Sequence, residues 1–375
     1  MDITQNLNLL GGMSAQTFMK KHWQRKPLLI RQAVPDFNPP VGRSELFELA
    51  AREDVESRLV QQRMSPNQGW QMTRGPFARR ALPALKLPGW TLLVQGVDLH
   101  VSGVHDLLRL FRFVPDARLD DVMISYASEG GGVGPHFDSY DVFLLQAHGR
   151  RRWRIGQQKD LRLQEGAPLK ILASFEPEQE FVLEPGDMLY LPPRYAHDGV
   201  ADGECMTYSI GFRAPSQGEL ARELLQRLAE DANDAVGDTL YRDVRQPAVT
   251  TPAELPHAMH EFARQALDAA LREPASLGRV LGEYLTEPKA NVWFDDRAAV
   301  VRKGWVELDR RTRMMYDAHH IFINGEAFRA GGRDAELMRR LADARCLEAS
   351  ELKAASPAAK SLLRDWRDAG WVHGA

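Results

Sequence analysis

The spacing of apolar residues divides the chain into stretches with different periodicities. Residues 14–23 and 44–51 fit short capped helices, and LLI at 28–30 fits a short strand. From about 57 to 215 the apolar residues fall into short runs separated by Gly, Pro or Asp, a pattern typical of an all-β sandwich or barrel. The expected strands are 57–63, 90–97, 121–128, 141–148, 150–156, 179–185 and 187–193.

After Pro215 the spacing becomes helical. Leucines recur at helical intervals over 217–235, and 253–285 continues in this style with breaks at Pro256 and Pro274. The apolar stripe of this segment can pack on the β domain or on a second copy of the chain, and the pattern favours neither. Its residues are Leu220, Leu224, Leu225 and Leu228.

The last stretch combines strand-like runs at 298–308 and 319–325 with short helices at 335–344, 347–355 and 358–370. A small set of helices that ends in a strand, here WVHGA, is coarsely similar to a winged helix. We therefore expect three domains, at 1–215, 216–290 and 291–375.

Composition narrows the class of protein. Hydrophobic residues make up 44% of the 375 residues and charged residues 26%, as in ordinary globular proteins. The formal net charge of −3 argues against a dedicated nucleic-acid binder, although direct nucleic-acid contact stays open. Two distant cysteines, Cys205 and Cys346, indicate free thiols in a reducing cytoplasm. No run is apolar and long enough for a transmembrane helix, and the N-terminus does not resemble a signal peptide.

The central segment 121–156 carries the chemistry. In a strand, residues i and i+2 point to the same face, so His136 and Asp138 can present an imidazole nitrogen and a carboxylate oxygen to one ion. Among the histidines of the chain, only His136 has an aspartate two places on. A third ligand is expected from the turn, strand and proline stop at 186–193, which deliver His197 to the mouth of a jelly roll.

Two histidines and one carboxylate form the facial triad of non-haem Fe(II) oxygenases. Three protein ligands leave room at the ion for a bidentate 2-oxo acid, here 2-oxoglutarate, and for O2. Zinc or manganese would accept the same ligands, and hydrogen-bonded strand histidines with no metal are the structural alternative.

A 2-oxoglutarate-dependent enzyme also needs a cation for the distal carboxylate of the co-substrate. Alternation along 150–154 places Arg151 on the same face as Trp153, which should point inward, and a buried guanidinium matches a carboxylate. Alternation along 121–127 places Ser125 where its hydroxyl can contact the same carboxylate or simply bond the backbone. The glycines at 130–134 lack the features of a phosphate loop and are expected to let the backbone pass close to co-substrate or substrate. Tyr140, on the face of Asp138, fits a core position better than a channel lining.

The chain resembles the JmjC-type ribosomal oxygenases, in particular the bacterial enzymes that hydroxylate arginine on ribosomal proteins. The resemblance is close over residues 18–215 and loose beyond. It lies in HWQRKPLLIR, SRLV, GPF, WTLLVQGV, LDDVMIS, GGGVGPHFDSYDVFLLQAHGRRRWRIG, LEPGDMLYLPPRYAHDG and YSIGFRAP.

The resemblance implies a fold and an activity. The fold is a double-stranded β-helix (the jelly roll of cupins and JmjC domains), followed by dimerising helices and a winged-helix-like domain. His136, Asp138 and His197 would hold Fe(II), while Arg151 and Ser125 would bind 2-oxoglutarate. The implied substrate is an arginine β-carbon of a large-subunit (50S) ribosomal protein, and the implied enzyme is a cytoplasmic homodimer.

One departure and several rival functions accompany this hypothesis. Related proteins usually have glycine where this chain has Arg194, and arginine adopts positive φ less easily than glycine. The rivals are the same chemistry on a histidine or another protein residue, demethylation, a metal-dependent cupin enzyme without 2-oxoglutarate, and a non-enzymatic module that docks on the ribosome.

Overall fold

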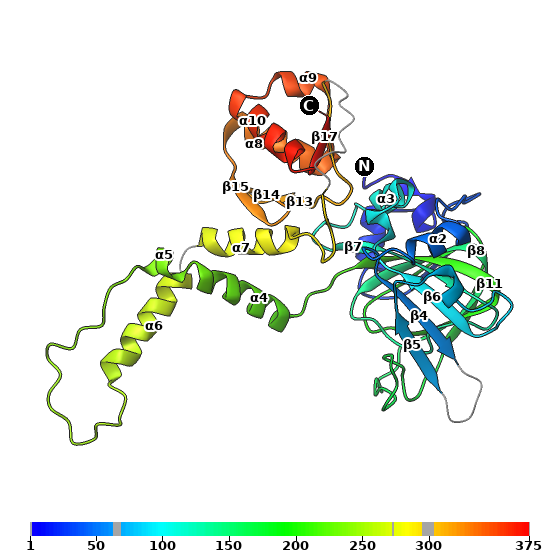
Figure 1. The fold of residues 1–375 in the computed structure, drawn as a ribbon, viewed down its shortest axis with the longest axis horizontal. Coiled ribbons are helices and arrows are strands. Elements are labelled where there is room, and N and C mark those ends of the chain that lie inside the picture. The colour runs from blue at the N-terminus through cyan, green and yellow to red at the C-terminus, as the bar shows by residue number, and fades with distance from the viewer. Residues whose placement is uncertain (1, 63–68, 272–273, 295–303, 375) are drawn as a thin grey trace. The chain divides into compact units, whose positions relative to one another are not determined.

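The computed structural model describes residues 2–62, 69–271, 274–294 and 304–374 (Figure 1). The chain forms two compact units, Met1–Ala214 and Pro215–Ala375. None of the helices in the described ranges has the length and apolar character needed to cross a membrane.

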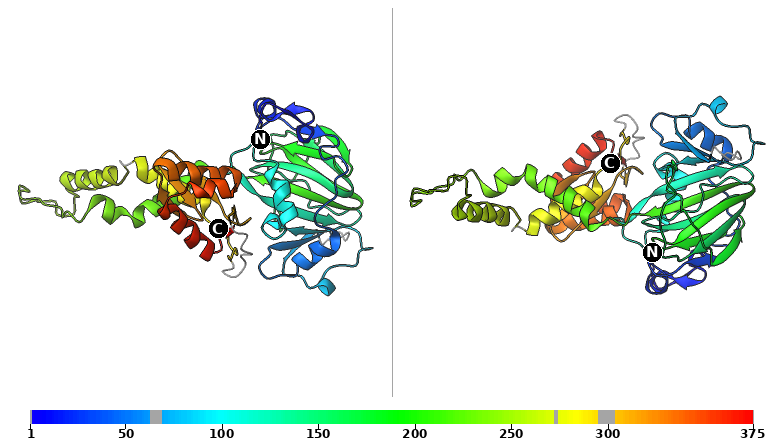
Figure 2. Two further views of the ribbon diagram at one scale, coloured as in Figure 1. Left: turned by 90° about the horizontal axis from the view of Figure 1, so that it is seen from above. Right: turned by 90° about the horizontal axis from the view of Figure 1, so that it is seen from below.

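The first unit is built on one curved sheet (Figure 2). Among its described residues, nine strands pair in the order β3-β10-β8-β11-β7-β6-β4-β5, and β9 pairs with β8. Neighbouring strands are antiparallel throughout. The strands are β3 Leu28–Ile30, β4 Ser57–Gln62, β5 Trp70–Arg74, β6 Trp90–Val94, β7 Leu119–Ala127, β8 Asp141–Gly156, β9 Gln179–Leu183, β10 Met188–Leu191 and β11 Ala196–Phe212. A hairpin of β1 Asn6–Leu7 and β2 Met13–Ser14 precedes them.

Two long strands, β8 and β11, run through both halves of the jelly roll. The first half of β8 pairs with β10 and the end of β11, whereas its second half pairs with β9 and the start of β11. The expected strands 141–148 and 150–156 thus form one continuous strand, and Gly149 lies where the two expected strands join. This glycine has φ +62°, and a Cβ there would lie 2.1 Å from the carbonyl oxygen of Glu204. Opposite it, the β11 register shifts between Asp202 and Met206.

Short helices and a large aromatic core cover one face of this sheet. The helices are α1 Ala15–Lys21, α2 Arg43–Leu49 and α3 Ser102–Arg109, with 3-10 turns at Asn8–Leu10, Arg79–Ala81 and Val97–Leu99. Phe18 of α1 is fully buried, and its ring lies 5.0 Å from that of Tyr190 and 5.4 Å from that of Phe143. Burying such rings is the main apolar contribution to a core of this kind. The metal-site strands therefore rest on a rigid layer.

The local signals gave only some of the element ends in this unit. Ser14 caps α1 by accepting a hydrogen bond from the Thr17 amide, as expected. α2 begins after Gly42, which has no side chain to cap it, so Ser44 is not its cap. β5 was not expected at all. Arg63, the last residue of the expected strand 57–63, lies outside the described residues.

The second unit starts with helices and ends in a small mixed domain. The helices are α4 Gln217–Glu230, α5 Ala232–Val236, α6 His257–Leu271 and α7 Pro274–Thr286. Pro256 directly precedes α6 and Pro274 opens α7, positions where the missing amide costs nothing.

Two three-stranded sheets and three helices form the end of the chain. The sheets are β16-β12-β17 and β13-β14-β15, with strands β12 Val306–Leu308, β13 Met314–Tyr316, β14 His320–Ile323, β15 Glu326–Arg329, β16 Cys346–Leu347 and β17 Val372–Gly374. The helices are α8 Gly332–Ala344, α9 Ala349–Lys353 and α10 Pro357–Asp368. They bury a core around Leu341, Leu363 and Trp366. Most of the expected strand 298–308 falls outside the described residues, and its end is β12.

Candidate metal centre

His136 and His197 face each other across a pair of backbone hydrogen bonds. The amide of His136 donates to the carbonyl of His197 at 2.9 Å, and the amide of His197 donates to the carbonyl of His136 at 2.8 Å. His197 is the second residue of β11, so the strand ladder fixes its position. The two rings lie 4.2 Å apart between centroids. The histidines expected as ligands are therefore side by side.

Backbone carbonyls set which ring nitrogen of each histidine is free. The Nδ1 of His136 is 2.9 Å from the carbonyl oxygen of Gly134, and the Nδ1 of His197 is 2.9 Å from that of Tyr195. A carbonyl can only accept, so each Nδ1 carries the proton and each Nε2 keeps a lone pair. Fixing the ring of a metal-ligating histidine through its other nitrogen is a general property of metal sites.

Asp138 completes a cluster of three ligands. Its carboxylate oxygen lies 3.6 Å from the Nε2 of His197. One ligand atom from each of His136, Asp138 and His197 lies within 4.8 Å of the others. Two imidazole nitrogens and one carboxylate oxygen are a donor set that suits Fe(II), so these residues fit the ion.

The protonation state of His197 also suits a ligand. Burial lowers the pKa of His197 to about 4, and the neighbouring His136 lowers it further than Asp138 can raise it. The imidazole is therefore neutral near pH 7, and only neutral imidazole can donate to a metal.

Arg151 projects inward beside this cluster, as the alternation of β8 predicts. Its side chain is buried, and its guanidinium lies over the ring of Trp153 at 5.1 Å. On the opposite face of β8 the arginines form ion pairs, namely Arg150 with Asp202, Arg152 with Glu180 and Arg154 with Asp198.

The contacts of Arg151 are all with neutral groups. Its Nη1 donates to Ser125 Oγ at 3.2 Å and to Thr207 Oγ1 at 3.5 Å, and its Nη2 donates to the carbonyl of Gly199 at 3.1 Å. No carboxylate of the described residues pairs with it, and its Nε is buried without a partner. A buried cation without an anion is costly. This site therefore fits the carboxylate of a small anionic ligand.

Two residues that support Arg151 were missed in the sequence. Thr207 Oγ1 donates to Gln146 Oε1 at 3.0 Å, and Gln146 Nε2 donates to the carbonyls of His148 and Gly149. Both are buried polar residues with apolar neighbours on either side in the chain, which is the one signal that singles them out. Ser125 contacts Arg151 and also donates to the carbonyl of Thr207 at 3.4 Å, so both expected roles of its hydroxyl are available.

The glycine-rich segment before His136 packs against the protein itself. A Cβ on Gly132 would lie 2.6 Å from the carbonyl oxygen of Gly199, and one on Gly134 would lie 2.9 Å from the ring of Trp70. These glycines thus allow close packing of the segment that leads to His136, and their expected closeness to co-substrate or substrate stays a prediction.

Tyr140 is not a core residue. Its side chain is 36% exposed, in contrast to the expected burial. Burial of the hydroxyl end raises its pKa, and the neighbouring carboxylates raise it further, those of Asp138, Asp121 and Asp120.

Arg194 adopts the backbone conformation that glycine would favour. Its φ is +62°, and its amide donates to the carbonyl of Asp138 at 2.7 Å. The turn before His197 therefore keeps its shape despite the arginine, and it ties the two ligand-bearing segments together.

Family models and known proteins match the chain along most of its length. A JmjC domain model matches residues 106–220, and a ROXA-like winged-helix model matches residues 264–373. The ribosomal protein uL16 3-hydroxylase of Escherichia coli is 37% identical over 277 residues, covering 72% of this chain and 71% of the relative.

Solved structures agree with these matches. The crystal structure of Escherichia coli YcfD superposes with a TM-score of 0.82 and 30% identity, covering 96% of this chain and 98% of that one. A second structure of YcfD, a ribosomal oxygenase in complex with cobalt and 2-oxoglutarate, gives a TM-score of 0.77 and 29% identity, with coverages of 96% and 97%.

Proposed function

Since this chain belongs to the JmjC-type ribosomal oxygenases, we propose that it hydroxylates the β-carbon of an arginine in the large-subunit ribosomal protein uL16. It is a 2-oxoglutarate-dependent dioxygenase that uses Fe(II) and O2. Fe(II) with 2-oxoglutarate bound supplies the oxidising chemistry that inserts one oxygen atom into a C–H bond, while 2-oxoglutarate becomes succinate and CO2.

Within this activity, the ligands of Fe(II) are His136, Asp138 and His197. One ligand atom of each lies within 4.8 Å of the others, and backbone hydrogen bonds join the segments that carry them. Such preorganisation would hold Fe(II) with three protein ligands and would leave room at the ion for the co-substrate and O2.

The single observation that carries the co-substrate assignment is the buried guanidinium of Arg151, which pairs with no carboxylate in the part of the chain that the structure describes. It takes the distal carboxylate of 2-oxoglutarate, and Ser125 adds a hydroxyl to the same end. A cupin enzyme without 2-oxoglutarate would have no use for this cation, and a docking module would need neither the cation nor the ligand cluster.

The charge beside the metal centre favours a cationic target residue. Tyr140 is partly exposed two residues beyond Asp138, and its pKa is raised first by burial and then by the carboxylates of Asp138, Asp121 and Asp120, against an opposing effect of Arg58. A negative potential of this kind attracts a guanidinium, while the neutral phenol ring offers it a π face. Arginine fits this environment better than a neutral histidine.

The test uses purified protein with Fe(II), 2-oxoglutarate and Escherichia coli uL16. After O2 is admitted, mass spectrometry should find one arginine of uL16 heavier by one oxygen atom, together with succinate. Asp138→Ala should abolish both products because it removes a ligand and leaves two histidines. Succinate without modified uL16 would reject uL16 as the substrate. Modification of a histidine of uL16 would show that the target residue is a histidine and not an arginine. Normal turnover by Asp138→Ala would contradict the ligand assignment.

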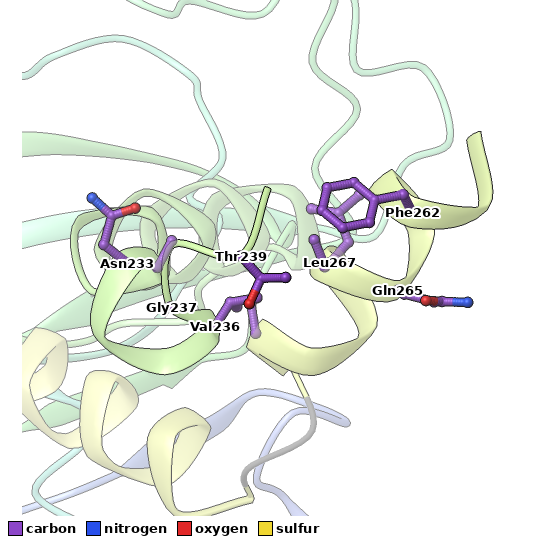
Figure 3. Close-up of a pocket in the computed structure, with 10 residues that line it drawn as sticks. Asn233, Val236, Gly237, Thr239, Phe262, Gln265 and Leu267 are labelled. Atoms are coloured by element: carbon purple, nitrogen blue, oxygen red, sulfur yellow. The ribbon is translucent and has the colours of Figure 1, made fainter. Parts of the chain in front are cut away.

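The helical part of the second unit supports a homodimer, which would act in the cytoplasm, where ribosomes are assembled. α6 exposes Leu267 and Leu271, 67% and 55% accessible, and α4 exposes Leu225 at 55%. Between α5 and α6 an apolar hollow of about 420 Å³ is lined by Val236, Phe262 and Leu267 among others (Figure 3). Exposed apolar surface of this kind indicates a protein partner, and a second copy would cover it symmetrically.

Sedimentation at several protein concentrations tests the dimer. The wild-type protein should sediment as a dimer, and Leu267→Asp should shift it to a monomer. The matched control is Leu163→Asp, an exposed leucine of the first unit, which should leave the dimer intact. A wild-type monomer at all concentrations would reject this proposal.

A further inference from the structure

β5, Trp70–Arg74, is the last strand at one border of the nine-stranded sheet (Figure 1). It pairs with β4 on one side, and no other strand of the described residues pairs with its second side. An open strand edge offers a row of backbone donors and acceptors to another extended chain. β5 contains no proline and has only one charged side chain, Arg74, so it lacks the usual protection of a free edge.

The register shows which backbone groups of β5 point off the sheet. Just beyond the strand, the amide of Gly75 donates to the carbonyl of Ser57, which makes these two residues a hydrogen-bonded pair. Hydrogen-bonded and non-hydrogen-bonded pairs alternate in an antiparallel ladder. The pairs Leu59/Thr73 and Gln61/Gln71 are therefore hydrogen-bonded too. The remaining residues of β5 turn their amides and carbonyls outward, namely Trp70, Met72 and Arg74.

The hydrogen bonds on the other side of β4 agree with this assignment. The amide of Gln62 donates to the carbonyl of Gly89, and the amide of Gln95 donates to the carbonyl of Glu56, so the even-numbered residues of β4 bond toward β6. Their partners in β5 consequently have no ladder bond to β4.

β5 also lies next to the metal centre. The ring of Trp70 sits against Gly134, where a Cβ would approach it to 2.9 Å, and Gly134 is two residues before His136. Trp70 and Met72 are half-buried, whereas Gln71 and Thr73 are exposed. Two of the three residues with outward backbone groups, Trp70 and Met72, thus belong to the inner, site-facing side of the sheet, whereas Arg74 is exposed.

We propose that β5 binds the substrate protein as an added strand. An extended segment of uL16 hydrogen-bonds to the outward amides and carbonyls of Trp70, Met72 and Arg74, and this pairing brings its target side chain to the metal centre. The inference rests on the proposed function and deepens it. Backbone pairing supplies affinity with little dependence on sequence, while the site itself selects the side chain.

Amide hydrogen exchange tests the pairing directly. The protein is loaded with Fe(II) and 2-oxoglutarate without O2, and exchange is followed with and without Escherichia coli uL16. The amides of Met72 and Arg74 should exchange at least tenfold more slowly with uL16, whereas those of Gln71 and Thr73, which already bond to β4, should change little. Hydroxylation of uL16 in the separate assay with O2, without added protection at Met72 and Arg74 in the exchange experiment, would overturn the added strand alone. Absence of both hydroxylation and protection would overturn the proposed function and this inference together.

A pair of variants separates the backbone from the side chain. Met72→Pro removes one outward amide and leaves the bonds to β4 intact, because proline is tolerated where the amide faces away from the sheet. Met72→Ala removes the same side chain and keeps the amide. We expect KM for uL16 to rise about three- to tenfold in the proline variant relative to the alanine variant, the effect of one hydrogen bond. The affinity for 2-oxoglutarate should stay equal in both variants. Equal KM values would contradict the proposal.

Discussion

Arg151 is held in place by neutral partners, and the weakest of these can be tested. Thr207 accepts from Arg151 at 3.5 Å and is itself oriented by Gln146. Thr207→Val keeps the shape of the side chain and removes the hydroxyl, so the guanidinium loses an acceptor. We expect the dissociation constant for 2-oxoglutarate to rise about three- to tenfold.

Calorimetry with Mn(II) in place of Fe(II) measures this constant without turnover. Thr207→Ser retains the hydroxyl and should bind 2-oxoglutarate like the wild type. A Val variant with unchanged affinity would show that Thr207 does not position Arg151.

Replacing Arg194 by glycine is expected to make the folded protein more stable. A left-handed backbone conformation costs a residue with a Cβ about 1 kcal/mol relative to glycine. Arg194→Gly should therefore raise the free energy of unfolding by about 1 kcal/mol, measured by urea denaturation. Arg194→Ala retains the Cβ and should bring no such gain, and a gain of equal size in both variants would trace the effect to the arginine side chain.

The residues that were predictable are those whose geometry is local. Arg151 shares a strand face with Trp153, so the period of a strand relates them. His136 and Asp138 are two residues apart and meet as expected, although His136 forms only an isolated β-bridge and Asp138 lies outside any strand. Thr207 and Gln146 are 61 residues apart in the chain and meet only through the pairing of β8 with β11. The register between β8 and β11 leaves no periodic signal in the sequence, so the role of Thr207 and Gln146 could not be predicted from it.

Among the elements, the long strands β8 and β11 depend on a glycine where they bend. A Cβ at Gly149 would lie 2.1 Å from the carbonyl oxygen of Glu204, while one at Gly203, also at positive φ, would meet no atom within 4 Å. Gly203→Ala should cost about 1 kcal/mol for its backbone conformation. Gly149→Ala adds a backbone clash and should cost a further 2 kcal/mol or so.

Urea denaturation of the two alanine variants measures the difference. Similar losses would mean that the bend can relax around a new methyl group, and that Gly149 matters only for its φ. The comparison therefore separates steric packing from backbone conformation at the junction of the two halves of the jelly roll.

The ends of elements could be predicted where a proline or a capping residue marks them. They were less predictable where pairing with a neighbouring strand determines them. Pro256 and Pro274 fixed the starts of α6 and α7, and Ser14 fixed that of α1. β5 has the sequence WQMTR, in which Trp70 and Met72 alternate with polar residues, but five residues are too few to indicate a strand, and it is formed by pairing with β4. The first half of β11 was not predicted either, because its pairing with β8 extends the strand through a glycine-containing stretch.

In the whole molecule, acid should weaken the fold, and Asp309 in the second unit provides the test. Burial alone would raise its pKa, but hydrogen bonds from His373 and Arg311 outweigh burial and hold the pKa well below the ordinary 3.8. A depressed carboxyl pKa stabilises the fold above the ordinary value, and this contribution is lost as pH falls below about 4. Asp309→Asn should cost about 2 kcal/mol at pH 7 and progressively less below pH 4.

Urea titrations of the intact protein at pH 7 and pH 3 measure this difference. The control is Asp160→Asn, which removes a fully exposed partner of Arg162 and should have little effect at either pH. An Asp309→Asn penalty that stays constant with pH would mean that the carboxylate charge contributes nothing.

The buried guanidinium of Arg151 links the fold to metabolism. Among the described residues no carboxylate pairs with it, so its charge in the interior of the jelly roll is uncompensated there. A ligand that binds only the folded state shifts the folding equilibrium in favour of that state. 2-Oxoglutarate would then act as a stabiliser as well as a reactant. In a cell depleted of it, the enzyme should not only work more slowly but also unfold more often and be degraded sooner, so its abundance would follow the supply of its own co-substrate.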